Sequence, residues 1–157
     1  MKHFLLINVL SFLLTGNVFG QSEKPLLYKI EIENWGLLLG PNTTWMISKD
    51  SISVRRQNLN GTVEIFTTVL STKEKDSIQT SLLKVDLNKL NRENVDNSAP
   101  DDMGEFDFKL TVGKATKEFQ IYQVYLDSIF NLVKQINIFL PNKYDIGYNA
   151  EYFRFKK

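Results

Sequence analysis

The chain has 157 residues, one histidine, no cysteine and a formal net charge of +1 at pH 7. This near-neutral charge excludes the long-range attraction to nucleic acid or anionic membranes that a strongly basic protein shows. Because there is no disulfide, the fold must be held by a hydrophobic core, and the chain is long enough for one ordinary domain.

The N-terminal stretch has the pattern of a signal peptide. A short basic start precedes the apolar run FLLINVLSFLL at residues 4–14, which is too short to cross a bilayer as a helix. The sequence VFG then ends at Gly20 and is followed by Gln21, which fits a signal-peptidase site. We predict a signal peptide at residues 1–20.

Removal of this segment changes the chemistry that the remaining chain can perform. His3 leaves with the signal, so residues 21–157 contain neither histidine nor cysteine, and their acidic and basic residues are equal in number. Ser–His–Asp and Cys–His catalysis and the usual zinc sites are thereby excluded. We expect a single α+β domain at residues 21–157, exported to the periplasm or secreted, without a cofactor or a membrane span.

The first part of this domain is predicted to form strands. LLYKIEIEN alternates apolar and charged residues from Tyr28 onward, as a half-buried strand does. Residues 35–42 carry two glycines and a proline and are expected to form a loop. A turn is expected at Asn60–Gly61, because glycine tolerates a positive φ. Further strands are predicted at residues 43–48, 51–56 and 62–70.

Helical periodicity first appears at residues 71–85. Ser71 and Glu74 have the spacing of a capping box. Three apolar residues then fall on one helical stripe, namely Ile78, Leu82 and Val85. The following residues, 86–104, have little periodicity and are expected to be irregular.

The second part of the domain repeats the change from strands to helix. EFDFKLTV, residues 105–112, alternates most clearly, and Gly113–Lys114 is predicted to turn it into a hairpin. The remaining predictions are a partner strand at 116–124, a helix at 125–141 that stops at Pro141, and an aromatic tail at 142–157 that forms a last strand or a strap over the core.

These elements together predict the fold class. The strands have one polar face, and both helices are amphipathic, so the helices should cover the apolar face of the sheet. We predict an α+β fold with a largely antiparallel sheet of about five or six strands and two amphipathic helices on one face.

The run NVDNSAPDDMGEFDF at residues 94–108 holds the densest group of carboxylates. Paired carboxyls could perform glycosidase-type acid–base chemistry, whereas a solvated loop that enters a strand is the alternative. The spacing does not match a helix–loop–helix calcium loop. We predict no metal site, and loose calcium binding by the first three acidic residues stays a hypothesis. The acidic candidates are Asp96, Asp101, Asp102, Glu105 and Asp107.

Aromatic side chains form the second group of candidates. Exposed aromatic clusters stack on sugars or anchor protein partners, whereas buried ones pack in the core. Both interpretations are open for the two tryptophans that flank the apolar loop and for the tyrosines of the tail. The aromatic ligand-binding candidates are Trp35, Trp45, Tyr144, Tyr148 and Tyr152.

Four stretches carry a resemblance. They are VFG followed by glutamine at residues 18–21, SKDSISVRR at 48–56, STKEKDSI at 71–78 and INIFLPNKYDIGY at 136–148. With these features the chain resembles small exported domains of unknown function from Gram-negative bacteria. The resemblance implies a fold type and transfers no catalytic residue.

The sequence therefore predicts an exported, non-enzymatic binding or protein-interaction domain whose partner is an unknown protein or a glycan. Nucleic acid is not expected as a partner. The first alternative is a small carboxylate-based glycan hydrolase that uses a pair among Asp101, Asp102, Glu105 and Asp107. The second alternative is an inhibitor or immunity-type protein.

Overall fold

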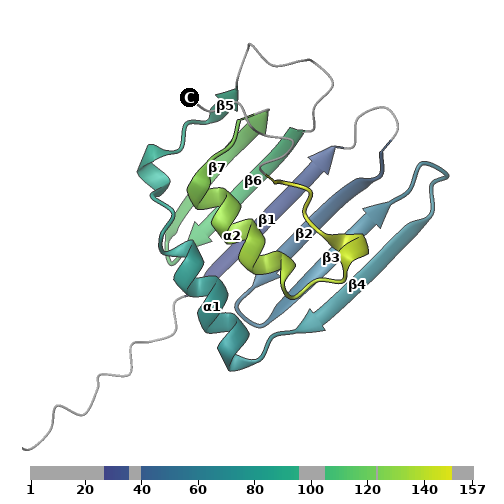
Figure 1. Ribbon diagram of the computed structural model, residues 1–157, viewed down its shortest axis with the longest axis horizontal. Helices are drawn as coiled ribbons and strands as arrows, with labels where there is room; N and C mark the ends of the chain where they lie inside the picture. The colour runs from purple at the N-terminus through teal and green to yellow at the C-terminus, as the bar shows by residue number, and fades with distance from the viewer. Residues whose placement is uncertain (1–26, 36–39, 96–104, 123, 150–157) are drawn as a thin grey trace, which may run out of the picture.

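A computed structural model describes residues 27–35, 40–95, 105–122 and 124–149 (Figure 1). The predicted signal peptide at residues 1–20 lies outside the described residues. Three of the acidic candidates and one aromatic candidate also lie outside them, namely Asp96, Asp101, Asp102 and Tyr152. In the described part, no helix is both long enough and apolar enough to cross a membrane.

Seven strands form one sheet in the order β4-β3-β2-β1-β6-β7-β5. The first four make an antiparallel meander: β1 (Tyr28–Trp35), β2 (Asn42–Ser48), β3 (Ser51–Gln57) and β4 (Val63–Val69). The hairpin of β6 (Glu105–Val112) and β7 (Ala115–Tyr122) returns to lie beside β1. A short strand, β5 (Glu93–Val95), pairs in parallel with β7.

The predicted α+β class is confirmed, and the sheet has one strand more than the upper expected number. The additional strand is β5, which falls in the stretch that was expected to be irregular. Its three residues are too few to show alternation. It is defined by its pairing with β7, and the buried Asn94 side chain adds hydrogen bonds to the carbonyls of Asn91 at 2.9 Å and Gln120 at 3.1 Å.

Both helices lie on the same face of the sheet (Figure 1). Helix α1 (Thr72–Leu82) begins after Ser71, where the Glu74 carboxylate accepts hydrogen bonds from the Ser71 backbone N–H at 2.7 Å and hydroxyl at 2.6 Å. These bonds hold the pKa of Glu74 below its ordinary value. The helix ends at Leu82, earlier than predicted, and a 3-10 turn, η2 (Leu87–Lys89), follows.

Helix α2 (Asp127–Asn137) ends before the proline that was expected to stop it. Beyond it, Phe139 and Leu140 donate to carbonyls three residues earlier, which tightens the chain out of the α-helical path. The Asn137 side chain instead binds the backbone of Ile146, accepting at 2.9 Å and donating at 3.1 Å. Pro141 then disfavours helical geometry at the residue before it.

Residues 142–149, here called the C-terminal strap, complete the core. The C-terminal strap begins with a 3-10 turn, η3 (Asn142–Tyr144), and residues 142–149 contain no strand. Residues 150–157 of the predicted tail lie outside the described residues. The Trp45 indole N–H donates to the Tyr144 carbonyl at 2.7 Å, and the rings of Phe66 and Tyr144 stack with centroids 5.2 Å apart. The strap therefore covers strands of the meander.

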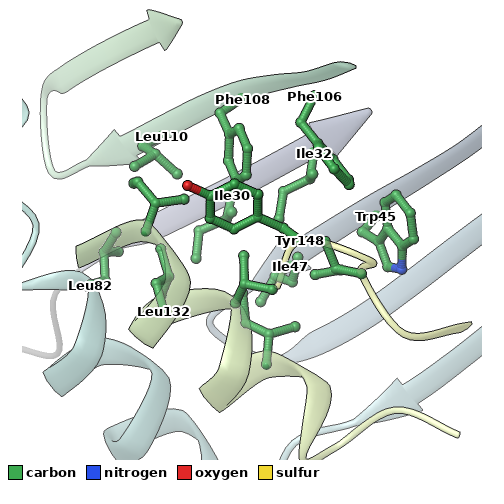
Figure 2. Close-up of a cluster of buried hydrophobic side chains, with 14 of the residues drawn as sticks. Ile30, Ile32, Trp45, Ile47, Leu82, Phe106, Phe108, Leu110, Leu132 and Tyr148 are labelled. Atoms are coloured by element: carbon green, nitrogen blue, oxygen red, sulfur yellow. The ribbon is translucent and has the colours of Figure 1, made fainter. Parts of the chain in front are cut away.

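The core lies between the sheet and this layer of helices and strap. Figure 2 shows side chains from β1, β6 and both helices around the ring of Tyr148. Phe106 and Phe108 contact that ring edge-on, with centroids 5.9 and 6.3 Å away. The fully buried side chains include Ile30, Ile32, Ile47, Ile52, Ile78, Leu110, Ile121, Ile129 and Leu132.

Tyr28 places a hydroxyl in this core without a hydrogen-bond partner among the described residues. Burial, followed by the charges of Asp50 and Asp76, raises the pKa of Tyr28 to about 12. A buried polar group without a partner costs about 1–3 kcal/mol of desolvation. Tyr28→Phe is therefore expected to maintain or increase the free energy of unfolding at pH 7, as measured by urea denaturation.

The same substitution is expected to change stability at alkaline pH. The fold favours neutral Tyr28, because its folded pKa of about 12 lies above the ordinary value of 10.0. Its contribution is complete below pH 10 and is lost as the pH rises from 10 to about 12. The wild type should therefore lose stability more steeply over this range than Tyr28→Phe. Coincident alkaline unfolding curves, followed by circular dichroism, would contradict the expectation.

Candidate functional site: an acidic pocket on the open sheet face

The face of the sheet opposite the helices is here called the open face. Both helices and the C-terminal strap lie on the other face, and none of the described residues outside the sheet forms a layer over this one (Figure 1). Strand alternation directs polar side chains toward it. The β1 side chains on this face are Lys29, Glu31, Glu33 and the exposed Trp35, whereas the alternate residues Tyr28, Ile30 and Ile32 are buried.

A pocket of about 530 Å³ opens on this face over β1, β6 and β7. Carboxylates predominate among its lining side chains, and only two cationic side chains accompany them. We call it the acidic pocket. Its carboxylates are Glu31, Glu33, Glu93, Asp107 and Glu118, and its cations are Arg92 and Lys109.

The register of the sheet arranges these side chains in two rows. In one row, Glu31 of β1 lies opposite Lys109 of β6, which lies opposite Glu118 of β7. In the other, Glu33 lies opposite Asp107, which is followed on β7 by Gln120. Directly opposed side chains have Cβ atoms about 4.5–5.5 Å apart. The first row alternates in charge, and the second places two carboxylates side by side.

The carboxylates of the first row form ion pairs with neighbouring lysines, so their charge is largely neutralised. The Lys109 ammonium contacts the Glu118 carboxylate at 2.6 Å, and Lys29 contacts Glu31 at 3.1 Å. The hydrogen bond with Lys109, more than its charge, lowers the pKa of Glu118, and the reciprocal bond raises the pKa of Lys109. This half of the pocket therefore has little net charge to offer a ligand.

The second row keeps an excess of negative charge. Asp107 accepts a hydrogen bond from the Trp35 indole N–H at 2.9 Å and another from the Gln120 amide at 3.4 Å. Among the described residues, neither Glu33 nor Glu93 has an ion-pair or hydrogen-bond partner. Opposed like charges are unfavourable. A cation that entered the pocket here would relieve this repulsion.

The pocket is not an evident metal site. Within the described ranges, no three Asp, Glu, His or Cys side chains come together as a group that could hold a metal ion. The acidic residues expected to be candidates for loose calcium binding lie outside these ranges, so that hypothesis stays a prediction.

Comparison with known proteins adds no identity. No protein-family model matches the chain, and no curated protein is similar to it in sequence. The function is therefore inferred from the residues of the protein itself.

The aromatic candidates differ in their exposure to solvent. Trp35 is 54% exposed and lies beside the acidic pocket through its bond to Asp107. Trp45, Tyr144 and Tyr148 are buried in the core. A ligand on the folded protein can thus reach Trp35, whereas the other three would first have to leave the core.

Two of the acidic candidates lie on the described strand β6. Glu105 and Asp107 both point to the open face, and the Gln120 amide donates to both carboxylates. Asp107 lines the acidic pocket, whereas Glu105 lies two residues before it, at the start of β6 and outside the pocket lining. A hydrolase that uses both carboxyls stays a prediction, and both are already engaged as hydrogen-bond acceptors.

Several residues that line the acidic pocket were not identified as candidates from the sequence. Glu31 and Glu33 were expected on the polar face of a strand, and Glu93 lay in a stretch expected to be irregular. Glu118 is on the partner strand of the β6–β7 hairpin. Alternation indicated the outward direction of the β1 residues, but only the β1–β6 pairing brings them to Asp107.

Proposed function

We propose that the protein is an exported, non-enzymatic domain that binds a protein partner through the open face of its sheet. The acidic pocket would receive lysine or arginine side chains of that partner. The observation that carries the proposal is the second row of the pocket, where Glu33 and Asp107 lie side by side and Glu33 has no cation of its own among the described residues.

The surroundings of the pocket support a protein partner. Trp35 is exposed beside Asp107, and Met46, which lies opposite Glu31 in the register, is exposed on the same face. Aromatic residues and methionine are enriched in protein interfaces, where a few of them supply most of the binding energy. Charged groups around them steer the encounter and select the partner.

Neutralising the pocket tests the proposal. In the double variant Glu33→Gln with Glu93→Gln, we expect binding of a hexalysine peptide to weaken by about 2- to 30-fold. Each exposed ion pair contributes about 0.2–1 kcal/mol to binding, and the variant removes two of them. Fluorescence anisotropy of the labelled peptide measures this change. In the wild type, binding should also weaken as salt is raised.

A matched control removes the same charge from the helical side of the protein. Asp76→Asn with Asp127→Asn changes two exposed carboxylates on α1 and α2 and should leave peptide binding as in the wild type. Equal weakening in both double variants would mean that only overall charge matters, and the pocket proposal would fail. A cross-linked pull-down from the cells that make the protein, read by mass spectrometry, should recover a partner with the wild type and lose it with Trp35→Ala.

A further inference from the structure

Among the described residues, no strand pairs with the outer edge of β4, and this free edge is a second surface, far along the sheet from the acidic pocket. We propose that β4 pairs antiparallel with β4 of a second copy of this chain, so that one sheet runs through a symmetric dimer. This inference does not depend on the proposed function, since the pocket lies over β1, β6 and β7.

About half of the backbone N–H and C=O groups of β4 are not used in pairing with β3. Leu70 donates to the Asp50 carbonyl and Asn58 donates to the Thr62 carbonyl, each at 2.9 Å, so even-numbered residues of β4 bond to β3. Hydrogen-bonded and non-bonded pairs alternate in an antiparallel ladder. The N–H and C=O groups that point to the free edge therefore belong to Val63, Ile65, Thr67 and Val69.

The side chains at this edge do nothing to block pairing. Protein edges are usually protected by lysine, proline, a bulge or a very short strand. β4 is seven residues long, and its one charged residue, Glu64, is already bound to Lys143 at 3.1 Å. Its outward side chains are uncharged, and three of the four are apolar, with Ile65 71% and Val69 79% exposed. The opposite edge of the sheet, β5, has only three residues.

The sequence of β4 is complementary to itself in one register. With Phe66 on the two-fold axis, Val63 of one copy faces Val69 of the other, and Ile65 faces Thr67. All four free residues then exchange hydrogen bonds, and β-branched side chains face each other, which stabilises a sheet. Glu64 faces Thr68 of the other copy, so no like charges meet. A register that centres Glu64 would oppose two carboxylates and leave part of the edge unpaired.

The inner face is consistent with this register. Phe66 is half-buried and stacks on Tyr144, so its ring lies at the edge of the core. On the two-fold axis, the two Phe66 rings would continue this aromatic stack from one copy to the other. The dimer would thereby extend the core as well as the sheet.

Sedimentation tests the dimer. We expect the wild-type protein to change from monomer to dimer between micromolar and millimolar concentration. Ile65→Lys should remain monomeric throughout, because a lysine at an edge prevents strand pairing. Ile138→Lys is the matched control, since Ile138 is a similarly exposed isoleucine, 66% against 71%, at the end of α2. It should dimerise as the wild type does.

Cross-linking tests the register without relying on a destabilised variant. The chain has no cysteine of its own. A hydrogen-bonded antiparallel pair has Cα atoms about 5.5 Å apart, within the disulfide range of about 4.4–6.8 Å. A mixture of the single variants Val63→Cys and Val69→Cys should therefore form a disulfide-linked dimer under mild oxidation, whereas each alone should not. A monomeric wild type, a dimer that survives Ile65→Lys, or absence of the mixed cross-link would each overturn the proposal.

Discussion

Tyr148→Ala is expected to lower the free energy of unfolding by about 3–5 kcal/mol, the usual cost of removing a buried aromatic side chain. The Tyr148 ring is 1% exposed and contacts Phe106, Phe108 and Tyr125. Its removal leaves a cavity at the centre of the core and releases the strap from the sheet (Figure 2). Urea denaturation followed by circular dichroism measures the loss.

Tyr148→Phe separates the hydroxyl from the ring. The hydroxyl accepts a hydrogen bond from the Leu126 N–H at 2.6 Å and donates one to the Val124 carbonyl at 3.0 Å, just before α2 begins. Removing it leaves these backbone groups without that partner, which should cost about 1–3 kcal/mol. Tyr28→Phe removes a hydroxyl that has no hydrogen-bond partner in the described part of the chain, so it should show no such loss. Equal effects of the two Tyr→Phe changes would contradict the assigned hydrogen bonds.

Leu132→Ala should also be strongly destabilising, by about 2–5 kcal/mol. Leu132 is fully buried on the inner face of α2, where Ile129, Val133 and Ile136 lie on the same stripe. Because the helix is fixed to the sheet by these contacts, it cannot move far enough to fill the space. The thermal midpoint and the urea midpoint should both fall.

Lys134→Ala is the control in the same helix. Lys134 is exposed, two residues from Leu132, and alanine is a good helix former. Its effect should stay within about 0.5 kcal/mol, as is usual for surface changes. A comparable loss in the two variants would contradict the assignment of the Leu132 loss to packing on the sheet, because alanine does not lower the helix propensity at either position.

The main elements of the fold could be predicted because one face of each strand is buried. β1 and β6 follow the alternation of their sequences, and Gly61 and Gly113 adopt the positive φ, +81° and +60°, that their turns suggested. β5 could not be predicted, because it depends on pairing with β7. The end of α2 was also missed, because Asn137 forms its hydrogen bonds with a segment beyond the helix.

The candidate site was predictable only in part. Both tryptophans were candidates, and the two could not be told apart while Trp35 was expected in a loop. In the structure β1 extends to Trp35, which has the strand phase of Glu31 and Glu33, whereas Trp45 has the phase of buried Ile47. The acidic pocket had no local signal. Its carboxylates come from β1, β6, β7 and the residues around β5, and they meet only through strand pairings that span the chain.

The pairing of β1 with β6 also determines when the protein can fold. One edge of β1 pairs with β2, its neighbour in the meander. The other edge pairs with β6, which is synthesised much later. The strap, which supplies Tyr144 and Tyr148 to the core, emerges from the ribosome later still. Pairings between segments distant in sequence form slowly. A nascent chain therefore remains without its complete native core until translation has passed residue 149, and for the proposed exported protein this delay leaves time for translocation before the fold is complete.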